Sequence, residues 1–252
     1  MRQVERLEKI LESLSGAGSV SVSSISEALG VSAATVRRDL GLLERQHLLS
    51  RTHGGAVGHG VLYELPLRYK GGRHKDEKLR IAHEAATRVA EGQAIGLTGG
   101  TTTTEVARAL VGHERLTLVT NALNIASEMA VRPNLKLVVT GGVARPESYE
   151  LVGPIAEASL AELNLDIVFV GADGISLDTG LTTHQEVEAH TNRALIERSR
   201  MVVVVADSSK IGLVAFARIC ELAEVSELIT DNAADPGILA GLTDIGVKVT
   251  TV

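Results

Sequence analysis

Apolar residues recur at two different periods along the chain, and the change of period divides it into two parts. Over residues 1–58 they recur every three to four positions, which is typical of amphipathic helices. From about residue 92 onward, short apolar runs alternate with helical patterns. The stretch 59–76 has no clean period and contains glycine, proline and basic residues. We therefore expect two domains, 1–58 and 77–252, with 59–76 as the connection between them.

The N-terminal part has the spacing of a helix-turn-helix. A first amphipathic helix carries a stripe from Val4 to Leu14. A short helix is expected to begin after Ser21 and to end at Gly30, and a longer one to run from after Ser32 to about residue 45, because serine caps helix starts and glycine ends helices. Residues 48–52 and 53–57 then predict a two-stranded wing with a glycine turn.

The third helix has an apolar face and an opposite face of small residues and arginines. At 100° per residue Val36, Leu40 and Leu43 share the inward face, whereas Arg38 and Gly41 lie opposite. Small residues allow close approach to DNA, and arginines bind phosphates or guanine edges. The candidate DNA contacts are Ser21, Ser32, Ala33, Ala34, Thr35, Arg37, Arg38, Arg45, Arg51, His53 and Gly54. Periodicity alone is equally compatible with a packing module whose arginines are solvated.

The C-terminal part alternates strands and helices, which predicts a mainly parallel sheet covered by helices. The expected strands are 94–97, 116–119, 135–139, 167–170, 201–205, 227–229 and 247–252. A helical pattern over 77–90 precedes them, and further helices are expected over 104–111, 122–131, 154–163, 184–199 and 236–242.

The carboxyl ends of these strands carry small, hydroxyl and amide residues, and ligands bind at such ends in open α/β sheets. The segment TGGTTTT at 98–104 leads from a strand into a helix, an arrangement that can bind an anion. Because it lacks the spacing of nucleotide-binding loops, a phosphate on a small molecule fits it better. The candidate effector residues are Thr98, Gly99, Gly100, Thr101, Thr102, Thr103, Thr120, Asn121, Gly141, Asp173 and Lys210. Each of these small-residue and hydroxyl segments, taken alone, is explained equally well as a helix cap.

Charge is distributed unevenly over the chain. The net charge is −6, but residues 1–80 carry a balance of +4 and residues 81–252 one of −10. A basic head on an acidic body suggests nucleic-acid contact by the head, although the basic residues of the connection are also those of a solvated linker. A single cysteine and a charged N-terminus without a signal-peptide core predict a cytoplasmic protein. No Cys/His cluster has zinc spacing, so we expect neither a metal nor a cofactor.

Two motifs carry a resemblance to a known family. Residues 35–40 (TVRRDL) within the helix-turn-helix, followed by 53–56 (HGGA), resemble the DeoR family of bacterial transcriptional regulators. The connection also matches the family through Glu64, Pro66 and Arg68, and the similarity continues to the C-terminus. The resemblance implies a winged helix-turn-helix, with its third helix in the major groove, and an effector domain similar in fold to ribose-5-phosphate isomerase.

The resemblance also implies roles for residues. Residues 100–103 would hold a phosphate, Lys210 would neutralise it, Asp173 would face the sugar, and Thr120 with Asn121 would line the site. The chain departs from the family or the isomerase at Thr98, Val170 and Gly174, where acids are common. Ser148, Tyr149, His184 and Gln185 are candidates for selecting the sugar.

The resulting hypothesis is a repressor of a sugar-catabolism operon, released from double-stranded operator DNA by a phosphorylated sugar. Paired half-sites are usual for this motif, so a homodimer or homotetramer is expected. One alternative is a sugar-phosphate isomerase or lyase with Asp173 as base and Glu186 or Glu188 assisting, but the flanking acids are missing. A second is an adaptor whose head contacts proteins instead of DNA.

Overall fold

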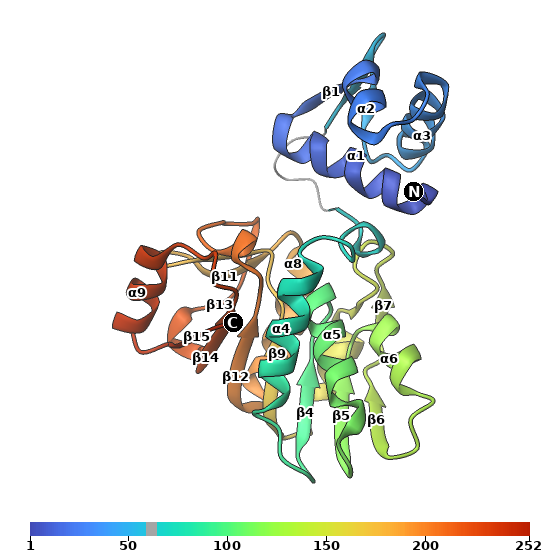
Figure 1. Cartoon of the computed structure of the whole chain (residues 1–252). Coiled ribbons are helices and arrows are strands. Elements are labelled where there is room, and N and C mark those ends of the chain that lie inside the picture. Colours follow the sequence, from blue (N-terminus) through green and yellow to red (C-terminus); the bar gives the residue numbers. More distant parts are fainter. Residues whose placement is uncertain (59–64) are drawn as a thin grey trace. The chain divides into compact units, whose positions relative to one another are not determined.

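The computed structural model describes residues 1–58 and 65–252 and divides the chain into two compact units, Met1–Arg73 and His74–Val252 (Figure 1). The boundary falls inside the connection expected over 59–76. Residues 59–64, with Glu64 of the family motif, lie outside the described residues. The short 3-10 helix η1 (Leu67–Tyr69) belongs to the N-terminal unit, because Tyr69 is buried in that unit's core.

Three helices form the N-terminal unit, as predicted: α1 (Gln3–Ala17), α2 (Val22–Leu29) and α3 (Ala33–Arg45). The Ser21 hydroxyl accepts the Ser24 N–H at 3.0 Å and caps α2. The Ser32 hydroxyl caps α3 in the same way, accepting the Thr35 N–H at 3.2 Å. Gly30 ends α2 in the left-handed conformation. The helix-turn-helix is therefore built by local signals that the sequence carries.

The wing has three strands where the sequence predicted two. β1 (Ser19–Ser21), β2 (Ser50–Arg51) and β3 (Gly55–Val57) form an antiparallel sheet in the order β1-β3-β2. The prediction missed β1 because it is only three residues long and ends on the serine that caps α2. A Cβ at Gly55 would lie 1.9 Å from the Val20 carbonyl oxygen, so only glycine fits where β3 passes β1.

A buried ion pair joins α3 to α1 inside the N-terminal unit. Asp39 is 1% exposed, and its carboxylate accepts hydrogen bonds from Arg6 Nε at 2.8 Å and Arg6 Nη2 at 3.2 Å. Thus the acid of the TVRRDL motif is structural, while the two arginines that precede it are exposed on the same helix.

Seven parallel strands form the sheet of the C-terminal unit, in the order β15-β14-β12-β9-β4-β5-β6 (Figure 1). All seven predicted strands are present, and the prediction of a parallel sheet is confirmed. Their bounds are β4 (Ala94–Leu97), β5 (Leu116–Thr120), β6 (Leu135–Val139), β9 (Leu165–Val170), β12 (Ser199–Val205), β14 (Glu227–Thr230) and β15 (Lys248–Thr251).

Helices cover both faces of this sheet. Alternate residues of the central strands enter two separate apolar clusters, as period-2 strands require. One cluster contains α4 (Lys75–Ala86), α5 (Thr101–Ala109) and α6 (Leu123–Met129). The other contains α7 (Pro154–Leu160), α8 (Glu186–Glu197) and α9 (Pro236–Asp244). Within the described residues no helix is long and apolar enough to span a bilayer.

Two small antiparallel sheets complete the unit. One pairs β7 (Val143–Ala144) with β8 (Leu151–Val152), and the other joins β10 (Gly174–Ser176), β11 (Gly180–Thr183) and β13 (Ala217–Cys220). These strands are not predicted from sequence, because two to four residues are too few to show a period.

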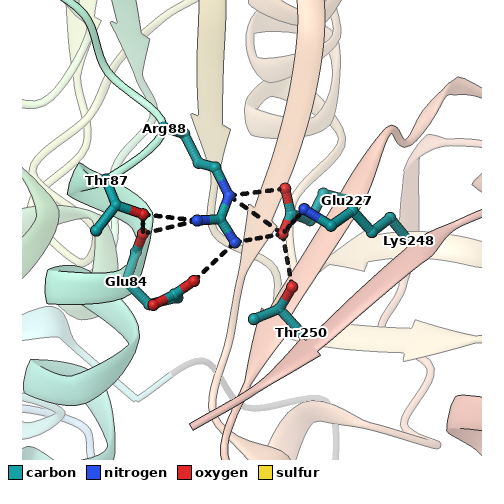
Figure 2. Close-up of polar contacts among 6 residues, drawn as sticks. All are labelled: Glu84, Thr87, Arg88, Glu227, Lys248 and Thr250. Carbon is teal, nitrogen blue, oxygen red and sulfur yellow. Dashed lines mark hydrogen bonds and ion pairs between the residues drawn. The ribbon is translucent and has the colours of Figure 1, made fainter.

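A network around Glu227 ties α4 to the last two strands (Figure 2). The Glu227 side chain is fully buried and accepts hydrogen bonds from Arg88 Nη2 at 2.8 Å and from Thr250 Oγ1 at 2.7 Å, while Lys248 Nζ lies 3.1 Å away. Arg88 also pairs with Glu84 at 2.8 Å. Burial by itself raises the pKa of Glu227, but the hydrogen bonds from Arg88, Thr250 and Lys248 outweigh it and lower that pKa to about 2.

The Glu227 network should make the stability of the protein depend on pH. Because folding lowers the pKa of Glu227, its charge stabilises the protein above the ordinary carboxyl pKa of 4.5, and this contribution is lost as pH falls towards about 2. Glu227→Gln should lower the free energy of unfolding by about 3 kcal/mol at pH 7, since it removes the buried carboxylate that pairs with Arg88 and Lys248. In urea denaturation, the difference in free energy of unfolding between this variant and the wild type should become smaller below pH 4.5. The control Glu114→Gln, at an exposed glutamate, should not differ from the wild type. A deficit independent of pH would contradict this account.

The buried pair of Asp39 and Arg6 should contribute to the stability of the N-terminal unit. Asp39→Ala should destabilise this unit by about 3 kcal/mol, because it leaves the Arg6 guanidinium without its buried partner. Hydrogen exchange on the full chain should then show faster exchange of the amides of α1 and α3. Arg2→Ala, which removes an exposed ion pair with Glu5, is the control and should cost less than about 1 kcal/mol. Equal protection in both variants would show that the buried pair is not needed.

Candidate functional site

The outward surface of α3 carries exposed arginines around a small-residue strip. Arg37 and Arg38 are exposed, as is Ala34. Gly41 lies on this face as predicted but is buried, because the guanidinium nitrogens of Arg45 and Arg51 lie 3.7 Å from the position its Cβ would take. Arg37 and Arg38 thus face outward from α3. Arg45 is also exposed, but its guanidinium lies over Gly41 of the same helix, beside that of Arg51 from the wing.

The wing adjoins this surface through Arg51. Its backbone N–H donates to Glu44 Oε1 at 3.1 Å, and its guanidinium lies 3.8 Å from the same carboxylate. The turn residues His53 and Gly54 are exposed. Of the other expected contacts, Ser21 and Ser32 are exposed helix caps, and Ala33 and Thr35 lie half-buried in the first turn of α3.

In the C-terminal unit, two of the expected site threonines hold the strands together. Thr98 is fully buried, and its hydroxyl accepts the Gly171 N–H at 3.0 Å, which links the ends of β4 and β9. The Thr120 hydroxyl donates to the Leu97 carbonyl at 2.8 Å and accepts the Ala122 N–H at 3.1 Å. Their side chains therefore position the loops that follow β4 and β5.

The start of α5 presents backbone donors. Gly100 precedes the helix at φ 136°, a conformation that glycine allows. The hydroxyls of Thr103 and Thr104 donate to the Gly100 carbonyl at 3.0 and 2.6 Å. The N–H groups of Thr101, Thr102 and Thr103 belong to the first turn, where a helix supplies no backbone partner, so this turn can bind an anion.

Gly99 has an acidic neighbour that the sequence did not predict. Its N–H donates to Glu150 Oε1 at 3.0 Å, and a Cβ on Gly99 would lie 2.4 Å from Glu150 Cγ. Asn121 Nδ2 donates to the same oxygen at 3.2 Å and lies 3.4 Å from Asn192 Oδ1. The amide oxygen of Asn121 is buried and has no hydrogen-bond partner. The first donor of the glycine loop is thus occupied by a carboxyl group of the chain itself.

Glu150 lies beside a second buried carboxylate, Glu188, with which it shares a hydrogen bond. Arg145 pairs with Glu188, which also accepts a hydrogen bond from Thr183 Oγ1 at 3.1 Å. Burial and then the charge of Glu188 raise the pKa of Glu150 to about 8, despite the hydrogen bonds from Gly99 and Asn121. The Glu150 carboxyl behind the glycine loop therefore favours its neutral form at neutral pH.

Asp173 extends this cluster towards Lys210. The Thr183 hydroxyl is 3.2 Å from Asp173 Oδ2, and Lys210 Nζ and His184 Nε2 each lie 3.9 Å from Asp173 Oδ1. Lys210 ends the 3-10 helix η3 (Ser208–Lys210), which Asp207 caps. The expected pair of Asp173 and Lys210 is thus brought together, with His184 beside it.

Gly141 has different surroundings, since it packs against α7. A Cβ there would lie 2.7 Å from Ile155 Cγ2, and its N–H is 3.4 Å from the Ser159 hydroxyl. Lys78 of α4 is a further lysine that was not predicted from sequence. It is buried, and its Nζ lies 4.0 Å from Asp207 Oδ2.

In the part of the chain that the structure describes, no group of three His, Cys, Asp or Glu residues is arranged to hold a metal ion.

Sequence reasoning thus missed Arg145, Glu150 and Lys78, and weighed Glu188 only as an assistant base. No local pattern marks Arg145 and Glu150, because they lie on the irregular connection between β7 and β8. The one signal in the sequence was charge: both residues stand in a short stretch between apolar strands.

Comparison with known proteins agrees with this architecture. Residues 6–59 match the model of a DeoR-like helix-turn-helix domain, and residues 73–232 that of the DeoR C terminal sensor domain. The chain is 38% identical to the HTH-type transcriptional regulator YulB of Bacillus subtilis, covering 100% of this chain and 98% of the relative. It is 33% identical to the Glycerol-3-phosphate regulon repressor of Escherichia coli, covering 99% of both.

Among solved structures, ribose 5-phosphate isomerase A of Methanocaldococcus jannaschii is similar at 24% identity, with a TM-score of 0.41 over 55% of each chain. The relatives that match along the whole length are regulators, and the prediction of a regulator instead of an enzyme is confirmed. The chain belongs to the DeoR family of transcriptional regulators, with a DNA-binding helix-turn-helix domain followed by a small-molecule sensor domain.

Proposed function

We propose that this protein represses a sugar-catabolism operon in the cytoplasm and that a phosphorylated sugar, bound in the sensor domain, lowers its affinity for operator DNA. The observation that carries the proposal is the start of α5, whose first-turn backbone N–H groups lie at the same edge of the sheet as Lys210. That arrangement suits one phosphate group on a small molecule. The E. coli relative is named for a glycerol-3-phosphate regulon, which is consistent with a phosphorylated effector.

The α3 surface supports DNA contact by the N-terminal domain. Arg37 and Arg38 project from the helix expected to enter the major groove, where arginines reach phosphates or guanine. Residues 81–252, nearly all of the sensor domain, carry a balance of −10, which repels DNA and confines contact to the head.

Linkage connects the two domains. If the effector binds more tightly to the arrangement that does not bind DNA, it must weaken operator binding by the same factor, typically ~1–3 kcal/mol. Paired operator half-sites match a two-fold symmetric assembly, so the proposal includes a homodimer or homotetramer.

The third prediction tests the DNA surface. Arg37→Ala with Arg38→Ala should weaken operator binding at least about tenfold and reduce the salt slope of log K by about one for each phosphate that is no longer neutralised. Fluorescence anisotropy with the protein's own upstream region, over a series of salt concentrations, measures both quantities. Arg200→Ala, which removes an exposed arginine of the sensor domain, is the control and should change neither. Unchanged affinity and slope in the double variant would favour the adaptor hypothesis.

The fourth prediction tests the phosphate site. Lys210→Met should weaken release of the operator by phosphorylated compounds about tenfold or more, because a charge-assisted hydrogen bond is removed. Operator binding is measured across a panel of sugar phosphates, and calorimetry gives the affinity of the DNA-free protein for each of them. Lys136→Met, at an exposed position on edge strand β6, is the matched control. If a compound releases DNA equally well from the Lys210 variant and the wild type, Lys210 does not bind the phosphate.

A further inference from the structure

The buried groups behind the glycine loop are of a different kind from the phosphate donors. Asn121 is fully buried, and its Nδ2 is oriented towards two acceptors, the oxygens of Glu150 and Asn192. Its Oδ1 therefore lies at the other end of the amide, buried and without a partner. An unpaired acceptor can be satisfied only by a hydrogen-bond donor, and leaving it unsatisfied is costly.

The neighbouring groups are also acceptors. Glu188 is a buried carboxylate, and Glu150 brings a second carboxyl group against it. The hydroxyl of Ser148, two residues before Glu150, is buried and unpartnered as well. A phosphate dianion has no proton to donate to such groups. A ligand hydroxyl donates one hydrogen bond and accepts others, so it fits these acceptors.

We infer that Asn121, Glu150 and Glu188 form a hydroxyl-binding subsite next to the phosphate-binding start of α5. This subsite selects monophosphates whose carbon chain carries hydroxyls, and it rejects a second phosphate. This inference rests on the proposed function and specifies the ligand class for the same site. Glu150 is the specificity-determining residue, because its carboxyl covers the Gly99 N–H that a second anion would otherwise use.

Charge in the subsite links binding to protonation. The charged and titratable groups around Glu150 are Glu188 of α8, Arg145 with its second partner Glu147, and, beyond Thr183, the cluster of Asp173, His184 and Lys210. Arg145 balances one of the two adjacent carboxyls, so the other is accommodated best with a proton. An anionic ligand is then bound with Glu150 neutral, and raising the pH should remove that proton and weaken binding by up to about tenfold per pH unit.

The experiment uses the full chain and calorimetry with defined probes: glycerol 3-phosphate, fructose 6-phosphate, fructose 1,6-bisphosphate, propyl phosphate and inorganic phosphate. Propyl phosphate is glycerol 3-phosphate without its hydroxyls. For the wild type, at least one hydroxyl-bearing monophosphate should bind about tenfold or more tightly than propyl phosphate, and fructose 1,6-bisphosphate more weakly than fructose 6-phosphate.

Two substitutions separate the roles of Glu150. Glu150→Ala should reduce the preference for hydroxyl-bearing compounds and raise the relative affinity for the bisphosphate and for inorganic phosphate, because the Gly99 N–H is uncovered. Glu150→Gln keeps the shape and hydrogen bonds, so it should retain the hydroxyl preference but abolish the fall in affinity between pH 7 and 9. The phosphate esters among the probes are already mostly dianionic there, so their own titration contributes little. Glu162→Gln, at an exposed residue near the amino end of β9, controls for the change in net charge.

The outcomes separate this inference from the proposed function. Phosphates that bind the wild type without hydroxyl preference, or a preference and pH profile identical in the two Glu150 variants, would overturn the subsite and leave the phosphate sensor standing. If neither inorganic phosphate nor any phosphate ester binds the wild type, the proposed function fails and the subsite fails with it.

Discussion

All seven strands of the sensor sheet run in one direction, and this shared direction determines where its chemistry can lie. Parallel pairing in register, such as Leu97 with Phe169, brings the loops after β4 and β9 to the same edge. There the Thr98 hydroxyl accepts the Gly171 N–H and joins them. Residues far apart in sequence, from Gly99 to Lys210, thus follow strand ends on one side of the sheet. The opposite, amino ends hold the Glu227 network, whose charges are balanced internally.

The two ends of the sheet differ in how their buried charge is balanced. Glu227 has Arg88, Lys248 and a threonine hydroxyl around one carboxylate, so it is ionised far below neutral pH. At the carboxyl end, Glu150 and Glu188 share Arg145, and burial favours the neutral form of one of them. The first arrangement stabilises the fold. The second leaves acceptors and a proton beside a helix N-terminus, which is useful for selecting a ligand.

The N-terminal domain shows how one short motif serves two roles. In TVRRDL, Arg37 and Arg38 face solvent, while Asp39 is buried on Arg6 of α1. A rotation of 100° per residue is enough to turn Arg38 to solvent and the next residue, Asp39, to the buried side of α3. The surface that contacts DNA in the proposal is therefore held in place by the residue next to it, and removal of the buried pair would disturb both packing and presentation.

The sequence by itself determined the features that local interactions specify. The caps Ser21 and Ser32, the glycine at the end of α2 and all seven long strands follow from residue type and period, and the TVRRDL and HGGA motifs indicated the family. Tertiary structure decided the rest. Glu150 accepts a hydrogen bond from Gly99, 51 positions away in sequence. Gly141 packs against α7, although it follows its strand in the same way as the other small residues at the carboxyl ends. Neither contact follows from local pattern, because burial and long-range pairing determine which polar groups meet. Those neighbours also determine whether a buried titratable group is charged.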